Sequence, residues 1–166
     1  MTEAEQIYEV KPRRSVTERM ASALSLHTAS PEVSGRGGIP ELTASDWMAA
    51  LARSGDRLGE AVVSVRHLDQ RGPLRRLVKD LHIWGMMRLL ESDSGLKISA
   101  KEHRRLARMA VSEYAEWDRL GREERMKWMS VGRSRWDSMR SHYSDLVDRM
   151  VQGESTTMRA VARRVR

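Results

Sequence analysis

The sequence predicts an all-α protein: a multi-helix domain that contains a tri-helical helix-turn-helix unit and follows a disordered N-terminal tail. From residue 43 onward, apolar residues recur every three to four positions, which is the period of an amphipathic helix. Ser or Thr residues that can cap helices, and glycines that can end them, separate these segments. Strand patterns are nearly absent and no segment repeats, so helices alone are expected to form the core.

Residues 1–43 are predicted to be a mostly disordered tail. They hold three of the four prolines and offer little apolar surface to bury. One short helix is predicted over residues 15–26, where Ser15 and Glu18 form a capping box. The glycine-rich run at residues 35–38 follows no strand and precedes no Gly-Lys-Ser/Thr, so it is predicted to be a linker rather than a phosphate-binding loop.

Three helices are predicted in an N-terminal helical region, residues 44–95. Thr43 or Ser45 caps the first helix, and Gly72-Pro73 precedes the third, in which Gly85 allows another helix to approach closely. The predicted spans are 46–53, 56–68 and 73–91. The apolar residues expected on the buried faces are Trp47, Leu51, Leu58, Val62, Val65, Leu74, Leu77, Val78, Leu81, Trp84 and Met87.

Residues 96–166 are predicted to form a helix-turn-helix DNA-binding region with a C-terminal helix. Ser99 and Glu102 form a capping box at its start, and Gln152-Gly153 is expected to end a helix. The predicted helices span 99–117, 122–130, 134–150 and 154–166. This region carries 17 Lys and Arg against 10 Asp and Glu, so it accounts for the whole formal charge of +7. Such a basic balance favours polyanionic partners such as nucleic acid.

The segment Arg122–Met150 is predicted to place a recognition helix in the major groove of DNA. Its second helix has an apolar back and a front of short polar and cationic side chains. Ser130 stands where this kind of turn usually has glycine, and Gly132 comes two residues later, so the turn geometry is left open. The alternative is a solvated helical hairpin. The residues predicted to bind DNA are Arg122, Arg133, Ser134, Arg135, Ser138, Arg140, Ser141 and His142.

Composition excludes several classes of site. The sequence has no Cys, which rules out disulfides, thiol catalysis and cysteine-based zinc sites. No nucleophile, phosphate-loop or zinc-protease motif is found, so the protein is predicted not to be an enzyme and to need no cofactor, metal or small-molecule substrate. No apolar run approaches 18 residues and no signal peptide is visible, which predicts a cytoplasmic protein without a membrane partner.

The histidines and tryptophans are predicted to be mostly structural. The five histidines do not pair at metal-ligand spacing, so each is expected to be a surface or core residue; they are His27, His67, His82, His103 and His142. Most tryptophans lie on apolar helix stripes and are expected in the core. Trp128 is the exception, and we expect it to be partly exposed and open to a partner.

Three stretches of the sequence carry a resemblance to a known family. They are SDWMAAL at 45–51, RRLARMAVSEYAEWDR at 104–119 and SRWDSMRSHYSDLVDRMVQGESTTMRAVARRVR at 134–166. In these stretches, and in their order, the chain resembles the late-gene antiterminator Q family of lambdoid phages. The lambda member has a cysteine zinc finger between the second and third stretches, whereas the join Leu120-Gly121-Arg122 is short and cysteine-free. A member of this kind is expected to bind DNA through the helix-turn-helix unit alone.

The resemblance implies a phage transcription antitermination factor. Such proteins bind double-stranded DNA at a late-promoter site, load onto host RNA polymerase in a sigma-dependent pause, and make it read through pauses and terminators. The resemblance implies contacts near the beta flap and RNA exit channel, and with sigma factor during loading. A separate polymerase-binding surface is expected in the earlier helices, on Arg53, Arg57, Arg75 and Arg88. The alternative is a helix-turn-helix DNA-binding protein without a polymerase role, such as a terminase small subunit or a repressor.

Overall fold

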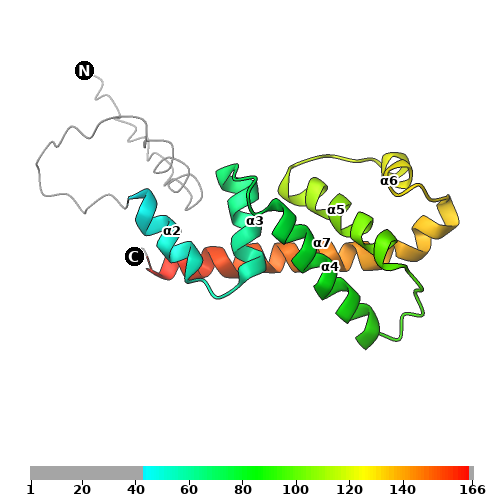
Figure 1. Cartoon of the computed structure of the whole chain (residues 1–166), viewed down its shortest axis with the longest axis horizontal. Coiled ribbons are helices and arrows are strands. Elements are labelled where there is room, and N and C mark those ends of the chain that lie inside the picture. Colours follow the sequence, from blue (N-terminus) through cyan, green and yellow to red (C-terminus); the bar gives the residue numbers. More distant parts are fainter. Residues whose placement is uncertain (1–42, 165–166) are drawn as a thin grey trace, which may run out of the picture.

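The computed structural model describes residues 43–164, which form helices and contain no strand (Figure 1). The predicted all-α class is confirmed. The predicted tail, its short helix at 15–26 and its linker at 35–38 lie outside the described residues, apart from Thr43. The helices are α2 (Ala44–Ala52), α3 (Arg57–Leu68), α4 (Leu74–Glu91), α5 (Ala100–Ala115), α6 (Arg122–Met129) and α7 (Arg133–Arg164).

Helix α7 is the element on which the other helices assemble. It continues for 32 residues and contacts α2, α3, α4 and α5. Figure 1 shows it running along the length of the molecule, with the C-terminal end beside α2. The prediction of two separate helices, 134–150 and 154–166, is therefore wrong, because the helix does not end at Gln152-Gly153.

A close contact between two glycines explains why α7 continues through Gly153. A Cβ atom built on Gly59 of α3 would lie 2.2 Å from the carbonyl oxygen of Gly153. Any larger residue at position 59 would therefore push the two backbones apart. A glycine inside a helix costs about 1 kcal/mol relative to alanine, which is small beside the burial gained along the α3–α7 contact. Gly153 serves helix packing here and does not end the helix.

Side-chain caps begin several of the helices, as the sequence predicted. Thr43 and Asp46 form a capping box at the start of α2, and Asp56 accepts hydrogen bonds from the amides of Leu58 and Gly59. Ser99 accepts a hydrogen bond from the amide of Glu102 at 3.1 Å. The second bond of the predicted box, from the Ser99 amide to the Glu102 carboxylate, does not form; the carboxylate instead accepts hydrogen bonds from a guanidinium of α7.

The two predicted regions share one hydrophobic core. The larger buried cluster takes Leu77 and Leu81 from α4, Leu106 from α5 and Met139 and Leu146 from α7, all fully buried. A smaller cluster joins α2 to the far end of α7, and its members are Trp47, Ala50, Leu51, Val63 and Val161. Both clusters include residues of α3 and α7, which hold the two parts of the core together.

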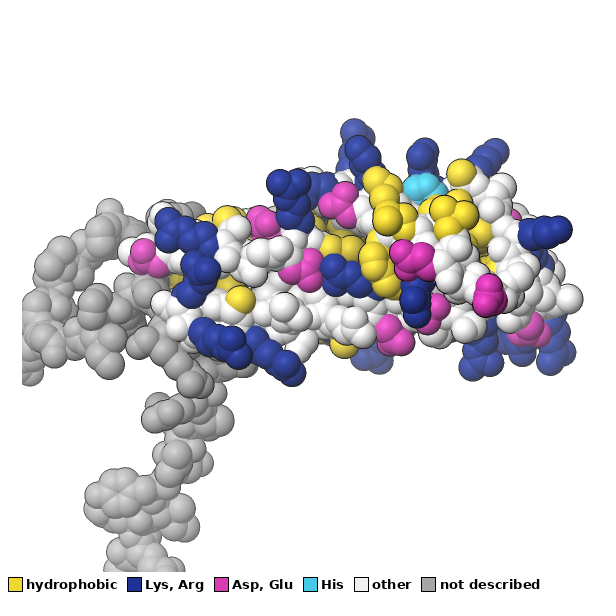
Figure 2. Space-filling view, turned by 90° about the horizontal axis from the view of Figure 1, so that it is seen from below, with side chains coloured by type: hydrophobic (Ala, Val, Ile, Leu, Met, Phe, Trp, Pro, Cys, Tyr) yellow, Lys and Arg dark blue, Asp and Glu magenta, His cyan; other side chains and the backbone are white. Residues whose placement is uncertain are grey.

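Helix α4 packs closely at its centre and is exposed towards its C-terminal end. A Cβ atom on Gly85 would lie 2.6 Å from Leu146, which confirms the predicted close helix contact. The prediction that Met87 is buried is wrong, because it is 56% exposed beside Ile83 and Leu90. Figure 1 shows this end of α4 projecting at the lower edge of the molecule, and Figure 2, seen from that side, shows hydrophobic side chains gathered among Lys and Arg. None of the described helices is both long and apolar enough to cross a membrane.

Candidate nucleic-acid interface

A three-residue turn, Ser130 to Gly132, joins α6 to α7. Ser130 adopts the left-handed conformation, with φ 56°, that glycine would usually provide at this position. Its amide donates a hydrogen bond to the carbonyl of Lys127, and Val131 packs against the core. Helix α7 begins at Arg133, so Ser134 lies in its first turn and is not its cap. DNA binding by this hairpin stays a prediction.

The residues predicted to bind DNA fall into several environments. Arg133, Ser134, Arg140 and Ser141 are exposed on α7. Arg122 lies on α6 and donates a hydrogen bond to Asp137 at 2.5 Å, with both side chains about half exposed. Ser138 is exposed, and its hydroxyl donates to the carbonyl of Arg135.

Arg135 joins α7 to the start of α5. Its guanidinium donates two hydrogen bonds to the carboxylate of Glu102, at 2.9 and 2.7 Å, and a third to the carbonyl oxygen of Lys97 at 2.7 Å. The Arg135 guanidinium lowers the pKa of the Glu102 carboxyl group by stabilising its charged form. Contact between Arg135 and a base would require these bonds to be exchanged.

His142 is not on the exposed front of α7, so this part of the predicted DNA surface is wrong. Its side chain is 5% exposed, and its Nε2 atom lies 2.8 Å from Nε2 of His103 on α5. Nδ1 of His103 lies 2.8 Å from Nδ1 of His82 on α4. These three residues, which we call the histidine chain, connect three helices through hydrogen bonds between neutral rings, since each neutral ring has one donor and one acceptor.

Burial governs the titration of the histidine chain. His103 is completely buried, and burial lowers its pKa to about 4, helped by the positive charge that His142 and His82 would carry beside it. Burial also lowers the pKa of His82 and of His142; Arg104 lowers the former further, and Asp145 opposes the shift in the latter. The histidine chain is therefore neutral at pH 7 and acts as part of the core.

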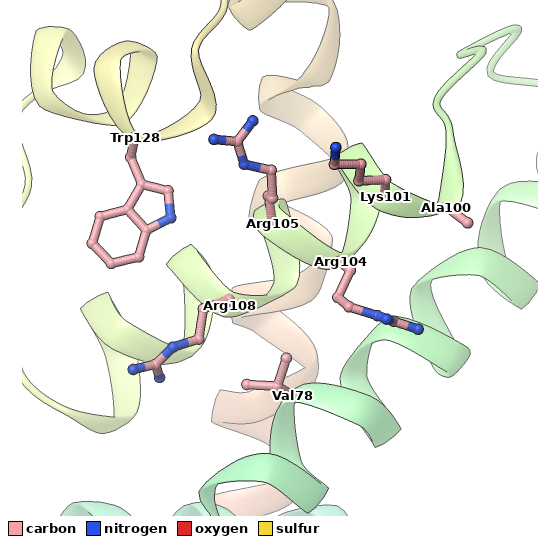
Figure 3. A pocket seen from close by; sticks show the side chains of 7 residues that line it. All are labelled: Val78, Ala100, Lys101, Arg104, Arg105, Arg108 and Trp128. Atoms are coloured by element: carbon pink, nitrogen blue, oxygen red, sulfur yellow. The ribbon is translucent and has the colours of Figure 1, made fainter.

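A basic groove lies between α5 and α6, on a face that the sequence analysis did not single out. Four cations follow one another along α5 at Lys101, Arg104, Arg105 and Arg108, a spacing that puts them on one side of a helix. Trp128 of α6 closes the opposite wall, and the cavity volume is about 520 Å³. Val78 of α4 and Ala100 complete the lining. Figure 3 shows the indole of Trp128 extending from α6 towards α5.

The charge of the groove is largely unbalanced. Lys101 and Arg104 are exposed and form no ion pair with any carboxylate among residues 43–164. Arg108 pairs with Glu116 at 2.5 Å, and Arg105 lies 3.5 Å from the Ser130 hydroxyl, next to the turn that begins α7. Three cations of the groove, Lys101, Arg104 and Arg105, therefore have no carboxylate partner among the described residues, and Arg105 lies next to the predicted helix-turn-helix segment.

The sequence did contain a signal for this groove. The cations of α5 alternate with the buried stripe of Leu106, Met109 and Ala110, so a basic face opposite an apolar face is visible in the residue pattern. The partial exposure of Trp128, at 38%, confirms the prediction made for that residue. What the sequence did not provide is the position of α6 across from α5, because this depends on the turn and on the core beneath it.

None of the four arginines predicted to bind polymerase lines the groove. Arg53 follows α2, Arg57 begins α3, and Arg75 and Arg88 lie on α4; all four are exposed. None of them forms an ion pair with another described residue. Their exposure is compatible with a contact surface, and the polymerase role stays a prediction.

Comparison of the chain with known protein families, with curated proteins and with solved structures finds no match. In the part of the chain that the structure describes, no three His, Asp or Glu side chains are arranged to hold a metal ion.

Proposed function

We propose that this protein binds nucleic acid through the phosphate backbone, with the α5 cations of the basic groove as its main contacts. The observation that carries this proposal is the row of Lys101, Arg104 and Arg105, three exposed cations on one helix face with no carboxylate partner among the described residues. A row of this kind matches the repeated negative charge of a phosphate backbone, and its binding releases condensed counterions. Arg133 and Arg140 on α7 are exposed and extend the set of available cations.

The salt dependence of binding tests this proposal. Fluorescence anisotropy with a labelled 20-base-pair duplex should give a linear fall of log affinity with log salt concentration. Replacing Lys101, Arg104 and Arg105 together by Gln removes three contacts, so the slope should fall by about two to three. The matched control replaces Arg53, Arg57 and Arg75 by Gln, which removes the same charge elsewhere and should change the slope by less than about one. Equal changes in the two triple variants would contradict a localised site.

We further propose a transcription antitermination role: binding at a late-promoter DNA site, loading onto paused host RNA polymerase with sigma factor, and read-through of terminators and pauses. The resemblance of residues 45–51, 104–119 and 134–166 to the antiterminator Q family supports it, as does the presence of a basic surface near the second and third of these stretches. The alternative is a DNA-binding protein with no polymerase role.

A protein that leaves its DNA site with polymerase needs a second surface, and the exposed arginines of α2 to α4 are the candidates. Charge reversal at Arg53, Arg57, Arg75 and Arg88 should leave duplex binding intact and abolish terminator read-through in transcription assays with purified polymerase, because interface charges act through complementarity with the partner. Unchanged read-through would place the polymerase contact elsewhere. Absence of any effect of the wild-type protein on read-through would favour the plain DNA-binding alternative.

A further inference from the structure

We infer that the basic groove takes an unpaired nucleobase, with Trp128 as its stacking surface, so that the protein recognises single-stranded nucleic acid at this site. The inference deepens the proposed nucleic-acid binding and rests on it. The cations of α5 account for contact with phosphates, but they do not account for the aromatic wall that faces them.

The exposure of Trp128 is the first observation. Its indole is 38% exposed, whereas the next residue, Met129, is 2% exposed and Met126 packs against the core. Helix α6 therefore already has the apolar face that anchors it, and Trp128 lies outside that face. A large aromatic side chain left partly in water is more costly than a polar one at the same position, and it is more often found where a partner binds.

The shape of the groove is the second observation. Its volume of about 520 Å³ lies within the range of about 300–1,000 Å³ that is usual for ligand sites. The lining includes the indole ring of Trp128 and the aliphatic stems of Arg104, Arg105 and Arg108. Figure 3 shows Arg104 extending away from Trp128, towards α4. An aromatic ring face with cations nearby suits a base whose phosphates lie on both sides.

The pairing state of the strand decides whether a base can reach Trp128. In a duplex, both faces of each base are stacked on its neighbours, so only phosphates and base edges meet the protein. In a single strand the face of a base is free, and stacking on an aromatic ring is tolerant of sequence because every base has a π-face. The groove should therefore favour a single strand over a duplex of equal length and charge.

A protein partner is the competing occupant of a Trp and Arg surface, since these residues are common in protein interfaces. The open α5 cations favour nucleic acid, because a single row of three to four positive charges at 3–4-residue spacing complements a continuous polyanion. A protein ligand would give no preference for single strands, so the same experiment separates the two.

The test measures the affinity of the whole chain for a fluorescein-labelled 12-nucleotide single strand and for the duplex of the same sequence. The wild type should prefer the single strand. Trp128→Leu should lower the ratio of single-strand to duplex affinity by about 10-fold, and Trp128→Tyr, which keeps a stacking ring, should restore most of it. Trp117→Leu is the matched control, since Trp117 is also exposed, at 58%, but does not line the groove, and it should leave the ratio unchanged.

Circular dichroism and thermal unfolding show whether each variant is folded, and the Tyr variant keeps the test informative if the Leu variant is unstable. Salt-dependent binding of both strands with no change in the ratio for Trp128→Leu would overturn the stacking site and leave the proposed function standing. Absence of salt-dependent binding to either strand would overturn the proposed function itself.

Discussion

Acidification from pH 7 to pH 5 should destabilise this protein through its histidine chain. His103 is completely buried, and each of its ring nitrogens lies 2.8 Å from a nitrogen of a neighbouring histidine. A proton added to His103 would place a charge in the core and leave both of its nitrogens as donors. Two charged groups act on the histidine chain: Arg104 disfavours protonation of His82, and Asp145 favours protonation of His142.

The size of the effect follows from the difference between the folded and unfolded pKa values of His103. In the unfolded chain the pKa is about 6.5, and in the folded protein it is lowered to about 4. The unfolded state therefore binds more protons between these values. The stability that neutral His103 contributes is fully present above pH 6.5 and is lost as the pH falls towards 4, at about 1.4 kcal/mol per pH unit. Between pH 6.5 and 5 the loss is about 2 kcal/mol.

Urea unfolding followed by circular dichroism at pH 7, 6 and 5 measures this loss. The lowered pKa values of Asp56, Glu102 and Glu154 start from ordinary carboxyl values of 3.8 to 4.5, so their contributions are lost mainly below pH 5. His103→Gln keeps a polar side chain that does not titrate, and its free energy of unfolding should change less over this range. An unchanged stability of the wild type from pH 7 to 5, or an equal pH slope in the variant, would show that protonation of His103 does not destabilise the fold.

Two further predictions concern packing and ion pairing. Gly59→Ala should lower the free energy of unfolding by about 3 kcal/mol or more, because its Cβ would lie 2.2 Å from the Gly153 carbonyl oxygen. The control is Gly72→Ala, where nothing lies within 4 Å, and it should change the free energy of unfolding by less than about 0.5 kcal/mol. Equal shifts of the thermal midpoint in the two variants would contradict the close contact. Arg135→Ala should lower the free energy of unfolding, measured with urea, by no more than about 1 kcal/mol, because the ion pair between Arg135 and Glu102 is partly exposed. A larger loss of binding free energy for DNA than of unfolding free energy would indicate that Arg135 exchanges Glu102 for DNA.

The local signals in the sequence predicted the helices well. Thr43 caps the first helix, which is one of the two caps expected there, and Gly85 lies at a close helix contact as expected. These features succeed because a cap or a buried stripe depends on residues within one or two turns. The helix bounds of α3 to α6 likewise agree with the predicted spans to within two residues at each end.

The predictions that failed depend on partners distant in the sequence. The local sequence predicts that a helix ends at Gly153, but in the structure this glycine lies inside α7 and packs against Gly59. His142 reads as an exposed residue next to Ser141, although the ring lies against His103, 39 positions away. Met87 has the spacing of a buried residue, but α4 extends past the helices that would cover it. In each case the local periodicity predicts the helix, whereas tertiary contacts determine which residues of that helix are buried.

The candidate site shows the same division. The exposure of Trp128 and the basic excess of residues 97–166 were visible in the sequence, whereas the facing arrangement of α5 and α6 was not. The predicted DNA-binding residues lie on α6 and α7 and do not include the cations of α5, although these lie at helical spacing from Lys101 to Arg108.

The position of α7 in the chain has a consequence for how the protein forms during synthesis. Helices α2 to α5 all pack on α7, which is the last of the described helices to leave the ribosome. Until residues as late as Val161 have emerged, Trp47 and Leu51 cannot complete the cluster that they form with α7, more than 100 positions along the chain. Contacts between residues this distant in the sequence form late in folding, because bringing the two segments together costs the conformational entropy of the chain between them. A nascent chain that stalls before α7 is complete would therefore expose the apolar faces of its earlier helices to chaperones and proteases.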